Sequence, residues 1–278
     1  MTTSTPFRVT LQARASGLLR ACHPGPATAV TVVLTAYGVS AGLSPARVVL
    51  VAAAVFAGQL SIGWSNDLID AARDRSAGRV DKPLATGELS ATTVRLACVL
   101  AVLATVLLSL SCGLVAGLLH LGCVAAGWAY NLGLKATVFS WLPYAMAFGG
   151  YPIVVTLAEP GAGPPPWFVP AAGALLGIGA HLVNVLPDLA DDEATGVRGL
   201  PHRLGHRRAS LLAVASLAAA TVVLVLGVVD AVPGAVLALV LAAVAVLVRL
   251  TLVARGRVPF RAAIGIALVD VLLLVVAG

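Results

Sequence analysis

The chain has 278 residues, of which 59% are apolar and only 11% are charged, and its formal net charge at pH 7 is +6. A soluble domain has about 45–50% apolar and about 25% charged residues, so this chain carries too little charge to cover a water-exposed surface. A mean hydropathy of +0.99 also excludes a disordered chain, which combines low hydrophobicity with high net charge. The bilayer is therefore the expected solvent. In that setting the basic residues report topology rather than nucleic-acid binding.

Nine apolar runs divide the chain. A transmembrane helix needs about 20 mostly apolar residues, and runs near that length lie at 27–44, 47–65, 95–112, 114–130, 138–157, 168–186, 209–228, 231–248 and 262–277. The sequence therefore predicts an all-α, multi-pass membrane protein that forms a single domain over residues 1–278. Residues 1–26 contain Arg8, Arg14 and Arg20 but no apolar core, so we expect a cytoplasmic N-terminal segment and no cleavable signal peptide.

Basic residues fall almost entirely on one side of the predicted spans. When nine spans are threaded from a cytoplasmic N-terminus, 17 of the 18 Lys and Arg residues lie on the cytoplasmic side and only Arg47 lies on the other. Positive residues concentrate in cytoplasmic loops, and one missed or extra span would invert every later loop. The asymmetry indicates nine spans in the cell membrane, with the N-terminus and the loops after the even-numbered spans in the cytoplasm.

Nine of the twelve acidic residues fall in two short stretches, each beginning where an even-numbered span ends. In the first stretch Asn66, Asp70 and Asp74 are spaced by four residues, and Asp67 precedes Asp70 by three. On a continuing helix these side chains share one face. The first stretch therefore predicts a cluster of oxygen ligands at the cytoplasmic end of the second span.

The second stretch repeats this spacing. Asp188 and Asp192 are four residues apart, and His181 and Asn184 extend the pattern backwards as a polar stripe on the sixth span. Polar groups within a span normally face the interior of the bundle and mark function. Pro187 stands at a position that can kink this span.

Carboxylates grouped in this way need a compensating partner. Like charges four residues apart destabilise a helix by a few tenths of a kcal/mol, and an acid near hydrocarbon costs about 2.5 kcal/mol or more. Mg²⁺ prefers oxygen ligands and commonly bridges protein carboxylates to phosphates, so two facing acidic clusters are suited to a metal-bound diphosphate. The alternative is solvated loop charge paired with Arg73, Arg75 and Arg79. We favour that alternative for Asp81, Glu88 and Glu193.

These segments resemble a known family. NDLIDAARD at 66–74 resembles the NDxxDxxxD signature of the UbiA superfamily of intramembrane prenyltransferases, and DLADD at 188–192 resembles its second signature, DxxxD. GRVDKPLATGELS after the first motif, YNLGLK at 130–135 and TGVRGLPHRLG after the second are similar to further family segments. The resemblance covers spans 1 to 7, and the last two spans only by hydrophobicity. Tyr130 and Lys135 are five residues apart, where the family more often has four.

The resemblance implies a fold and an activity. Family members have nine transmembrane helices around a central cavity, bind an isoprenyl diphosphate through Mg²⁺, and transfer the prenyl group to a lipophilic, usually aromatic acceptor. The metal ligands implied for this chain are Asn66, Asp67, Asp70, Asp74, Asp188 and Asp192. The catalytic groups are Asp67, Asp70, Asp188 and Lys135, and the substrate-binding groups are Arg73, Lys82, Tyr130, Lys135, His181, Asn184 and Arg198.

Two other functions stay open at this point. Some members of the superfamily resemble terpene cyclases, which ionise the same diphosphate without an external acceptor. A transporter is the third possibility, although acids in transporters tend to lie near the bilayer midplane rather than at span ends.

Several side chains within the spans have more than one interpretation. The aromatic rings of Trp64, Tyr130, Tyr144 and Tyr151 can stabilise an allylic cation or belong to an interfacial belt. The spacings Gly113/Gly117 and Gly173/Gly177 predict close helix packing within the bundle. Asp270 lies inside the last span, and we expect it to be hydrogen-bonded in the interior.

Overall fold

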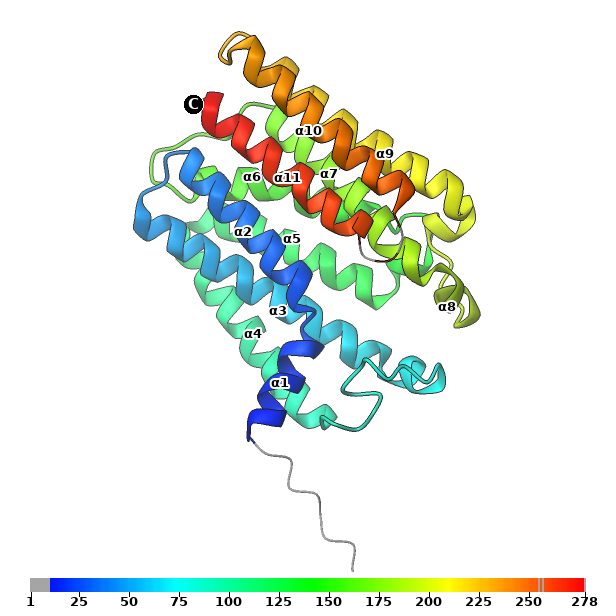
Figure 1. Ribbon diagram of the computed structural model, residues 1–278. Helices are drawn as coiled ribbons and strands as arrows, with labels where there is room; N and C mark the ends of the chain where they lie inside the picture. Colours follow the sequence, from blue (N-terminus) through cyan, green and yellow to red (C-terminus); the bar gives the residue numbers. More distant parts are fainter. Residues whose placement is uncertain (1–10, 255, 257, 278) are drawn as a thin grey trace, which may run out of the picture.

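The computed structural model describes residues 11–254, 256 and 258–277, which form helices joined by short connections (Figure 1). The first half contains α1 (Leu11–Ala21), α2 (Pro24–Ser40), α3 (Pro45–Ser76), α4 (Ala91–Ser111), α5 (Leu114–Leu132) and the 3₁₀ turn η1 (Leu134–Ala136). The second half contains α6 (Leu142–Leu157), α7 (Phe168–Val185), the 3₁₀ turn η2 (Leu186–Asp188), α8 (Leu189–Ala194), α9 (Leu200–Val228), α10 (Gly234–Val253) and α11 (Val258–Ala277). The described residues contain no strand, as the all-α prediction requires.

Six helices form a closed ring in which each contacts the next: α2, α3, α5, α6, α7 and α11. The ring closes because α11, near the end of the chain, packs against α2, near its start, as the red and blue ribbons of Figure 1 show. Helix α4 packs outside on α3 and α5, while α9 and α10 pack outside on α7 and α11. The outer helices α4 and α10 have few buried residues, which suits apolar helices that face lipid.

In the described chain, nine helices of 16 or more residues lie at the positions of the nine predicted spans. Of the described helices, seven are long and apolar enough to cross a membrane. The other two predicted spans correspond to α2, with 17 residues, and to α6, with 16 residues. A multi-pass membrane fold is therefore confirmed, whereas the number of nine crossings stays a prediction.

Helix α3 extends well past the predicted end of its span. The apolar run stops at residue 65, but the helix continues to Ser76 and carries the whole of the first aspartate-rich motif. Charge ends a hydropathy run without ending a helix, because backbone hydrogen bonding does not depend on the polarity of the side chain. The predicted common face of this motif is therefore present.

A 3₁₀ turn interrupts the helix that carries the second motif, at the position where Pro187 can kink the span. Helix α7 ends at Val185, and the 3₁₀ turn η2 separates it from the six-residue helix α8. Pro187 has no N–H to donate and lies inside this turn, which accounts for the break. His181 lies in α7 and Asp192 in α8, so the polar stripe does not run along one regular α-helix beyond Val185.

Glycines allow α7 to approach α6 closely. A Cβ added to Gly173 would lie 2.4 Å from the carbonyl oxygen of Phe148, and one added to Gly177 would lie 2.5 Å from that of Tyr144. No other residue fits at these contacts, so the close packing predicted from the Gly173/Gly177 spacing is confirmed. The contact fixes the wall of α6 that carries Tyr144 and Phe148.

Basic side chains gather at one end of the bundle. In the described chain they lie in α1, at the C-terminal ends of α3 and α10, at the N-terminal ends of α4, α9 and α11, and in the connecting segments at that end. Arg47, at the start of α3, lies at the opposite end. Three of the basic residues used for the topology, Arg8, Arg255 and Arg257, lie outside the described residues.

Candidate functional site

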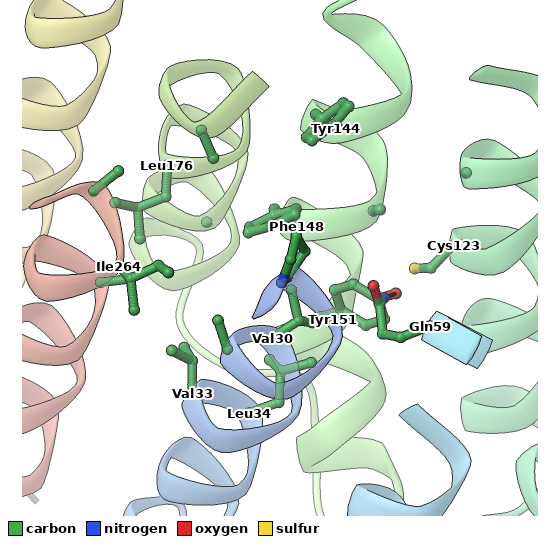
Figure 2. A pocket seen from close by; sticks show the side chains of 18 of the residues that line it. Val30, Val33, Leu34, Gln59, Cys123, Tyr144, Phe148, Tyr151, Leu176 and Ile264 are labelled. Atoms are coloured by element: carbon green, nitrogen blue, oxygen red, sulfur yellow. Dashed lines mark hydrogen bonds between the residues drawn. The ribbon is translucent and has the colours of Figure 1, made fainter. Parts of the chain in front are cut away.

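A cavity of about 320 Å³ lies inside the ring of helices. Most of its wall is apolar, and Figure 2 shows how side chains from four helices converge on it: Val30, Val33 and Leu34 from α2, Phe148 and Tyr151 from α6, Leu176 from α7 and Ile264 from α11. The central cavity implied by the family resemblance is therefore present.

One part of the cavity wall is polar. His23, Asn66, Asn131, Tyr130 and Asn184 line it there, next to the two aspartate-rich motifs. Asn131 holds its place by donating hydrogen bonds from Nδ2 to the carbonyl oxygen of Ile62 and to Ser65 Oγ, both at 2.9 Å. The cavity thus joins a polar mouth to an apolar interior.

Asp67 lies behind this polar mouth, against His23 of its wall, and is only 1% exposed. Lys82 Nζ donates to its Oδ1 at 2.6 Å, and His23 Nε2 lies 3.0 Å from the same oxygen. Its second oxygen, Oδ2, is buried and has no hydrogen-bond partner among the described residues. A buried carboxylate oxygen normally has a partner, so Oδ2 is free to accept a further ligand.

Asp70 lies one turn further along α3 and is the most heavily paired acid. Lys135 Nζ donates to both of its carboxylate oxygens at 2.6 Å, and Arg73 forms an ion pair with it at 2.8 Å. Asn66 donates from Nδ2 to Asp70 Oδ2 at 3.1 Å and to Asn131 Oδ1 at 3.2 Å. This geometry leaves the side-chain amide oxygen of Asn66, Oδ1, available as a metal ligand.

Lys135 reaches Asp70 from the turn η1, between α5 and α6. Burial lowers the pKa of its ammonium group, while the hydrogen bond and charge of Asp70 and the charge of Asp192 oppose that shift. Lys135 is therefore bound to the first motif and lies within electrostatic reach of the second. The structure brings it to Asp70, and its role at the site stays a prediction.

The second motif lies close enough to the first for the charges of Arg73 and Lys135 to act on Asp192, but it is held more loosely. Asp188 is half-buried, and the side chain of Asp192 is 25% exposed with an oxygen 3.7 Å from His202 Nε2. The pKa of Arg79 is raised, first by its hydrogen bond with Asp81 and also by the carboxylates of Asp188 and Asp74. Arg79 therefore lies within electrostatic reach of both motifs.

The three acids interpreted as ordinary loop charges are each paired with an arginine. Asp81 binds Arg79 at 2.9 Å, Glu88 pairs with Arg20, and Glu193 lies 3.8 Å from Arg198. The pairing with Arg79 lowers the pKa of Asp81 to about 2. Arg198 is 67% exposed at this surface contact, so the structure does not bring it to the site with Lys135 as expected.

The residues present fit a hard divalent cation. The described chain contains no group of three or more His, Cys, Asp or Glu side chains that could hold a metal ion, and Lys82, Lys135 and Arg73 pair with the carboxylates of the first motif. The donor set of carboxylates and an amide oxygen is nevertheless the one that Mg²⁺ prefers. Asp67 Oδ2 is a ligand atom without a partner among the described residues, and because it is buried the side chain would have to turn toward the cavity to meet a cation.

His181 differs from its predicted role as a substrate-binding group. It is 1% exposed and absent from the cavity wall, and its Nε2 lies 3.0 Å from Ser140 Oγ. Its ring centroid lies 5.7 Å from that of Tyr130 and 4.9 Å from that of Tyr144, both of which line the cavity. The structure therefore places His181 behind the aromatic wall, where it positions the two tyrosines.

Aromatic and polar side chains divide between wall and support. Tyr130, Tyr144 and Tyr151 line the cavity, whereas Trp64 donates to the carbonyl oxygen of Leu18 at 3.0 Å and ties α3 to α1. Sequence reasoning missed His23, which is a single histidine before the first span and has no spacing pattern. It also missed Asn131, although this residue lies within the YNLGLK segment.

The comparisons with known proteins agree with this geometry. The model of the UbiA prenyltransferase family matches residues 26–275. The bacteriochlorophyll synthase 33 kDa chain of Cereibacter sphaeroides is 31% identical over 179 residues, which are 60% of this chain. The matched region spans 56% of that relative, so this chain covers little more than half of its length.

Solved structures share the fold. A UbiA homolog from Archaeoglobus fulgidus bound to GPP and Mg²⁺ superposes with a TM-score of 0.71 at 18% identity, covering 94% of this chain and 98% of that one. The apo structure of a UbiA homolog from Aeropyrum pernix K1 has a TM-score of 0.68 at 20% identity, covering 89% and 95%. At these identities the likeness establishes the fold alone.

Proposed function

The chain belongs to the UbiA prenyltransferase family, and we propose that it is an integral membrane prenyltransferase that moves an isoprenyl group from an isoprenyl diphosphate to a lipophilic, aromatic acceptor. The observation that carries the proposal is the buried Asp67, with its unpartnered Oδ2, next to His23 in the polar wall of an otherwise apolar cavity. A site for a charged head and a hydrocarbon tail requires this pairing of environments. The Archaeoglobus fulgidus relative bound to GPP and Mg²⁺ supports the same class of ligand.

Mg²⁺ is the proposed cofactor. The residues that would hold it are Asn66, Asp67, Asp70 and Asp74 on α3, Asp188 in η2 and Asp192 in α8. When bound, the cation supplies charge neutralisation for the departing diphosphate.

The basic residues at the mouth complete the diphosphate site. Lys82 lies 2.6 Å from a carboxylate oxygen of Asp67. Lys135 lies 2.6 Å from one of Asp70, with which Arg73 also pairs. If the aspartates held Mg²⁺, these cations would be free to donate to phosphate oxygens, to which charged donors form short, strong hydrogen bonds. We assign Arg198 a weaker contribution, because its side chain is largely exposed.

The cavity wall has two tasks in this proposal. Its apolar side chains exclude the water that would otherwise capture an allylic cation. The ring faces of Tyr130, Tyr144 and Tyr151 line the path of the prenyl group, where an aromatic face attracts a cation. Asn184 also lines this region and hydrogen-bonds Tyr144, so it orients one of the rings.

We further propose nine membrane crossings in the cell membrane with the mouth of the cavity in the cytoplasm. The clustering of the described basic residues at the mouth end supports this orientation. An isoprenyl diphosphate is water-soluble at its head, so access from the cytoplasm suits its chemistry.

Purified protein incubated with Mg²⁺ and geranyl, farnesyl or geranylgeranyl diphosphate tests the proposal through the release of diphosphate. We expect release with at least one chain length, its loss in EDTA, and its loss in Asp67→Asn. Asp230→Asn is the matched control, because this aspartate lies in the turn before α10 at the opposite end of the bundle. No release with any chain length and a panel of aromatic acceptors would overturn the proposal. Release with a hydrocarbon or terpene alcohol as the sole product, and no acceptor requirement, would instead indicate the cyclase.

A further inference from the structure

Asp270 is an acid inside a membrane helix that the diphosphate site does not use. It is 1% exposed and lines the same cavity, in company with Leu224, Val271 and Leu274. It follows Val258, the first residue of α11, by 12 residues, which is about 18 Å along a helix that rises 1.5 Å per residue. Asp270 therefore belongs to the deep, apolar part of the cavity rather than to its mouth.

The carboxyl group of Asp270 is only half satisfied. Thr221 Oγ1 donates a hydrogen bond to its Oδ1 at 2.8 Å, which confirms the interior hydrogen bond expected from the sequence. Its Oδ2 is buried and has no partner in the part of the chain that the structure describes. A carboxylate inside a span costs about 2.5–3.5 kcal/mol, and one hydroxyl compensates only one of its two oxygens.

A purely structural role does not account for this arrangement. A tie between α9 and α11 through Thr221 needs a single acceptor, which a smaller or uncharged side chain would supply at lower cost. Asp270 lies at the cavity wall, so a small movement of its side chain would bring the buried Oδ2 within reach of an incoming molecule. A donor on that molecule would satisfy it.

The wall formed by α3 and α6 carries a second polar feature. Gln59 Nε2 donates to Tyr151 OH at 3.0 Å, and both side chains line the cavity, as Figure 2 shows. A hydrocarbon tail forms no hydrogen bond with Gln59, with the hydroxyl group of Tyr151 or with Asp270. A ligand with polar groups at its remote end uses them.

We infer that Asp270 forms the polar end of an acceptor subsite and that the acceptor carries a hydroxyl or N–H donor that binds Asp270 Oδ2. This inference rests on the proposed function and deepens it by defining the acceptor class. The acceptor is a lipophilic molecule with a hydrogen-bond donor distant from the carbon that is alkylated. No donor of this kind is needed at the mouth, where the diphosphate binds.

A matched pair of probes tests the subsite by direct binding. 4-Nonylphenol and 4-nonylanisole have nearly the same shape, but only the phenol donates a hydrogen bond. We measure the binding of each radiolabelled probe to the full chain in detergent, in excess of its partition into protein-free micelles. We expect the phenol to bind about tenfold more tightly, the scale of one hydrogen bond to a charged group.

Three variants locate the preference. Asp270→Asn conserves shape, but its amide can donate to either probe, so the preference should fall below twofold. Asp270→Leu should give the same result and serves if the asparagine variant unfolds at a lower temperature. Thr221→Val removes the link to α9 but keeps the carboxyl group, so it should retain the preference. A preference below threefold in the native chain, or one that survives in both Asp270 variants, would overturn the inference.

Release of diphosphate from geranyl diphosphate is measured on the same native preparation. Release without a phenol preference would sink the acceptor subsite alone. A phenol preference without release from any diphosphate would sink the proposed function and leave a donor-binding cavity.

Discussion

The two aspartate-rich segments differ in the helices that carry them. The first lies on α3, a single helix of 32 residues, and Asp67, Asp70 and Asp74 are all buried. The second lies on η2 and the six-residue α8. No residue of α8 is buried. The first segment is therefore fixed by packing before any ligand arrives, whereas the second has few contacts to hold it. We expect the first to act as a rigid half of the site and the second to adjust to the ligand.

Replacing Asp70 should have the largest effect. Asp70→Asn removes the charge that holds Lys135 and Arg73, and loss of one preorganised electrostatic contact typically costs about 10²–10³-fold in rate. The rate of Mg²⁺-dependent diphosphate release measures this loss. Asp81→Asn is the control, because Asp81 pairs with Arg79 outside the cavity wall. A rate for Asp70→Asn within threefold of the native value would contradict the rigid half.

Lys135 should contribute more than Arg198. Lys135→Met is expected to lower kcat/KM for the diphosphate by about 10–100-fold, the range for one hydrogen bond to a charged group, mainly through KM. Arg198→Met should change it by less than about threefold, because an exposed ion pair contributes little. Steady-state kinetics on both variants compare a buried with an exposed cation. Equal losses would show that Arg198 moves into the site when substrate binds.

A substitution in the second motif should weaken metal binding more than it slows the reaction. Asp192 is partly exposed, so water screens its charge, and electrostatic interactions are weaker in such surroundings. Asp192→Asn should raise the Mg²⁺ concentration needed for half-maximal rate by about tenfold, a change of about 1.4 kcal/mol. A Mg²⁺ titration of the initial rate measures it. A loss as large as that of Asp70→Asn would make the two motifs equivalent.

The smallest effect concerns the packing of α7 against α6. Gly177→Ala places a Cβ 2.5 Å from the carbonyl oxygen of Tyr144, and such overpacking typically costs about 1–3 kcal/mol. Thermal unfolding in detergent should show a lower Tm. Gly122→Ala is the control, because its Cβ would meet nothing within 4 Å. An unchanged Tm for Gly177→Ala would mean that α7 is not fixed by α6.

Much of this arrangement could be predicted from the sequence, and the rest could not for identifiable reasons. Helix positions follow from apolar runs, and the common face of Asp67 and Asp70 follows from their spacing on a helix. The pairings of Lys82 and His23 with Asp67 join residues 15 and 44 positions away, and no local pattern encodes such contacts. Pro187 indicates a break in the helix before the second motif, but whether the helix kinks or ends there depends on packing.

The sequence also does not predict whether a polar residue lines the cavity or lies behind its wall. His181 and Asn184 are three residues apart, yet one supports the tyrosines from behind and the other lines the cavity. The spacing places both on the interior of the bundle without choosing between these positions. Asp270 was recognisable as an interior acid, but its unpartnered oxygen is a property of the three-dimensional packing.

Binding of Mn²⁺, a paramagnetic substitute for Mg²⁺, tests the central claim most directly. Electron paramagnetic resonance should show Mn²⁺ bound to the native chain in the presence of geranyl diphosphate, and free Mn²⁺ with Asp67→Asn under the same conditions. Asp230→Asn should bind as the native chain does. Equal Mn²⁺ binding by the native chain and Asp67→Asn would contradict the assignment of the metal and diphosphate to the mouth of this cavity.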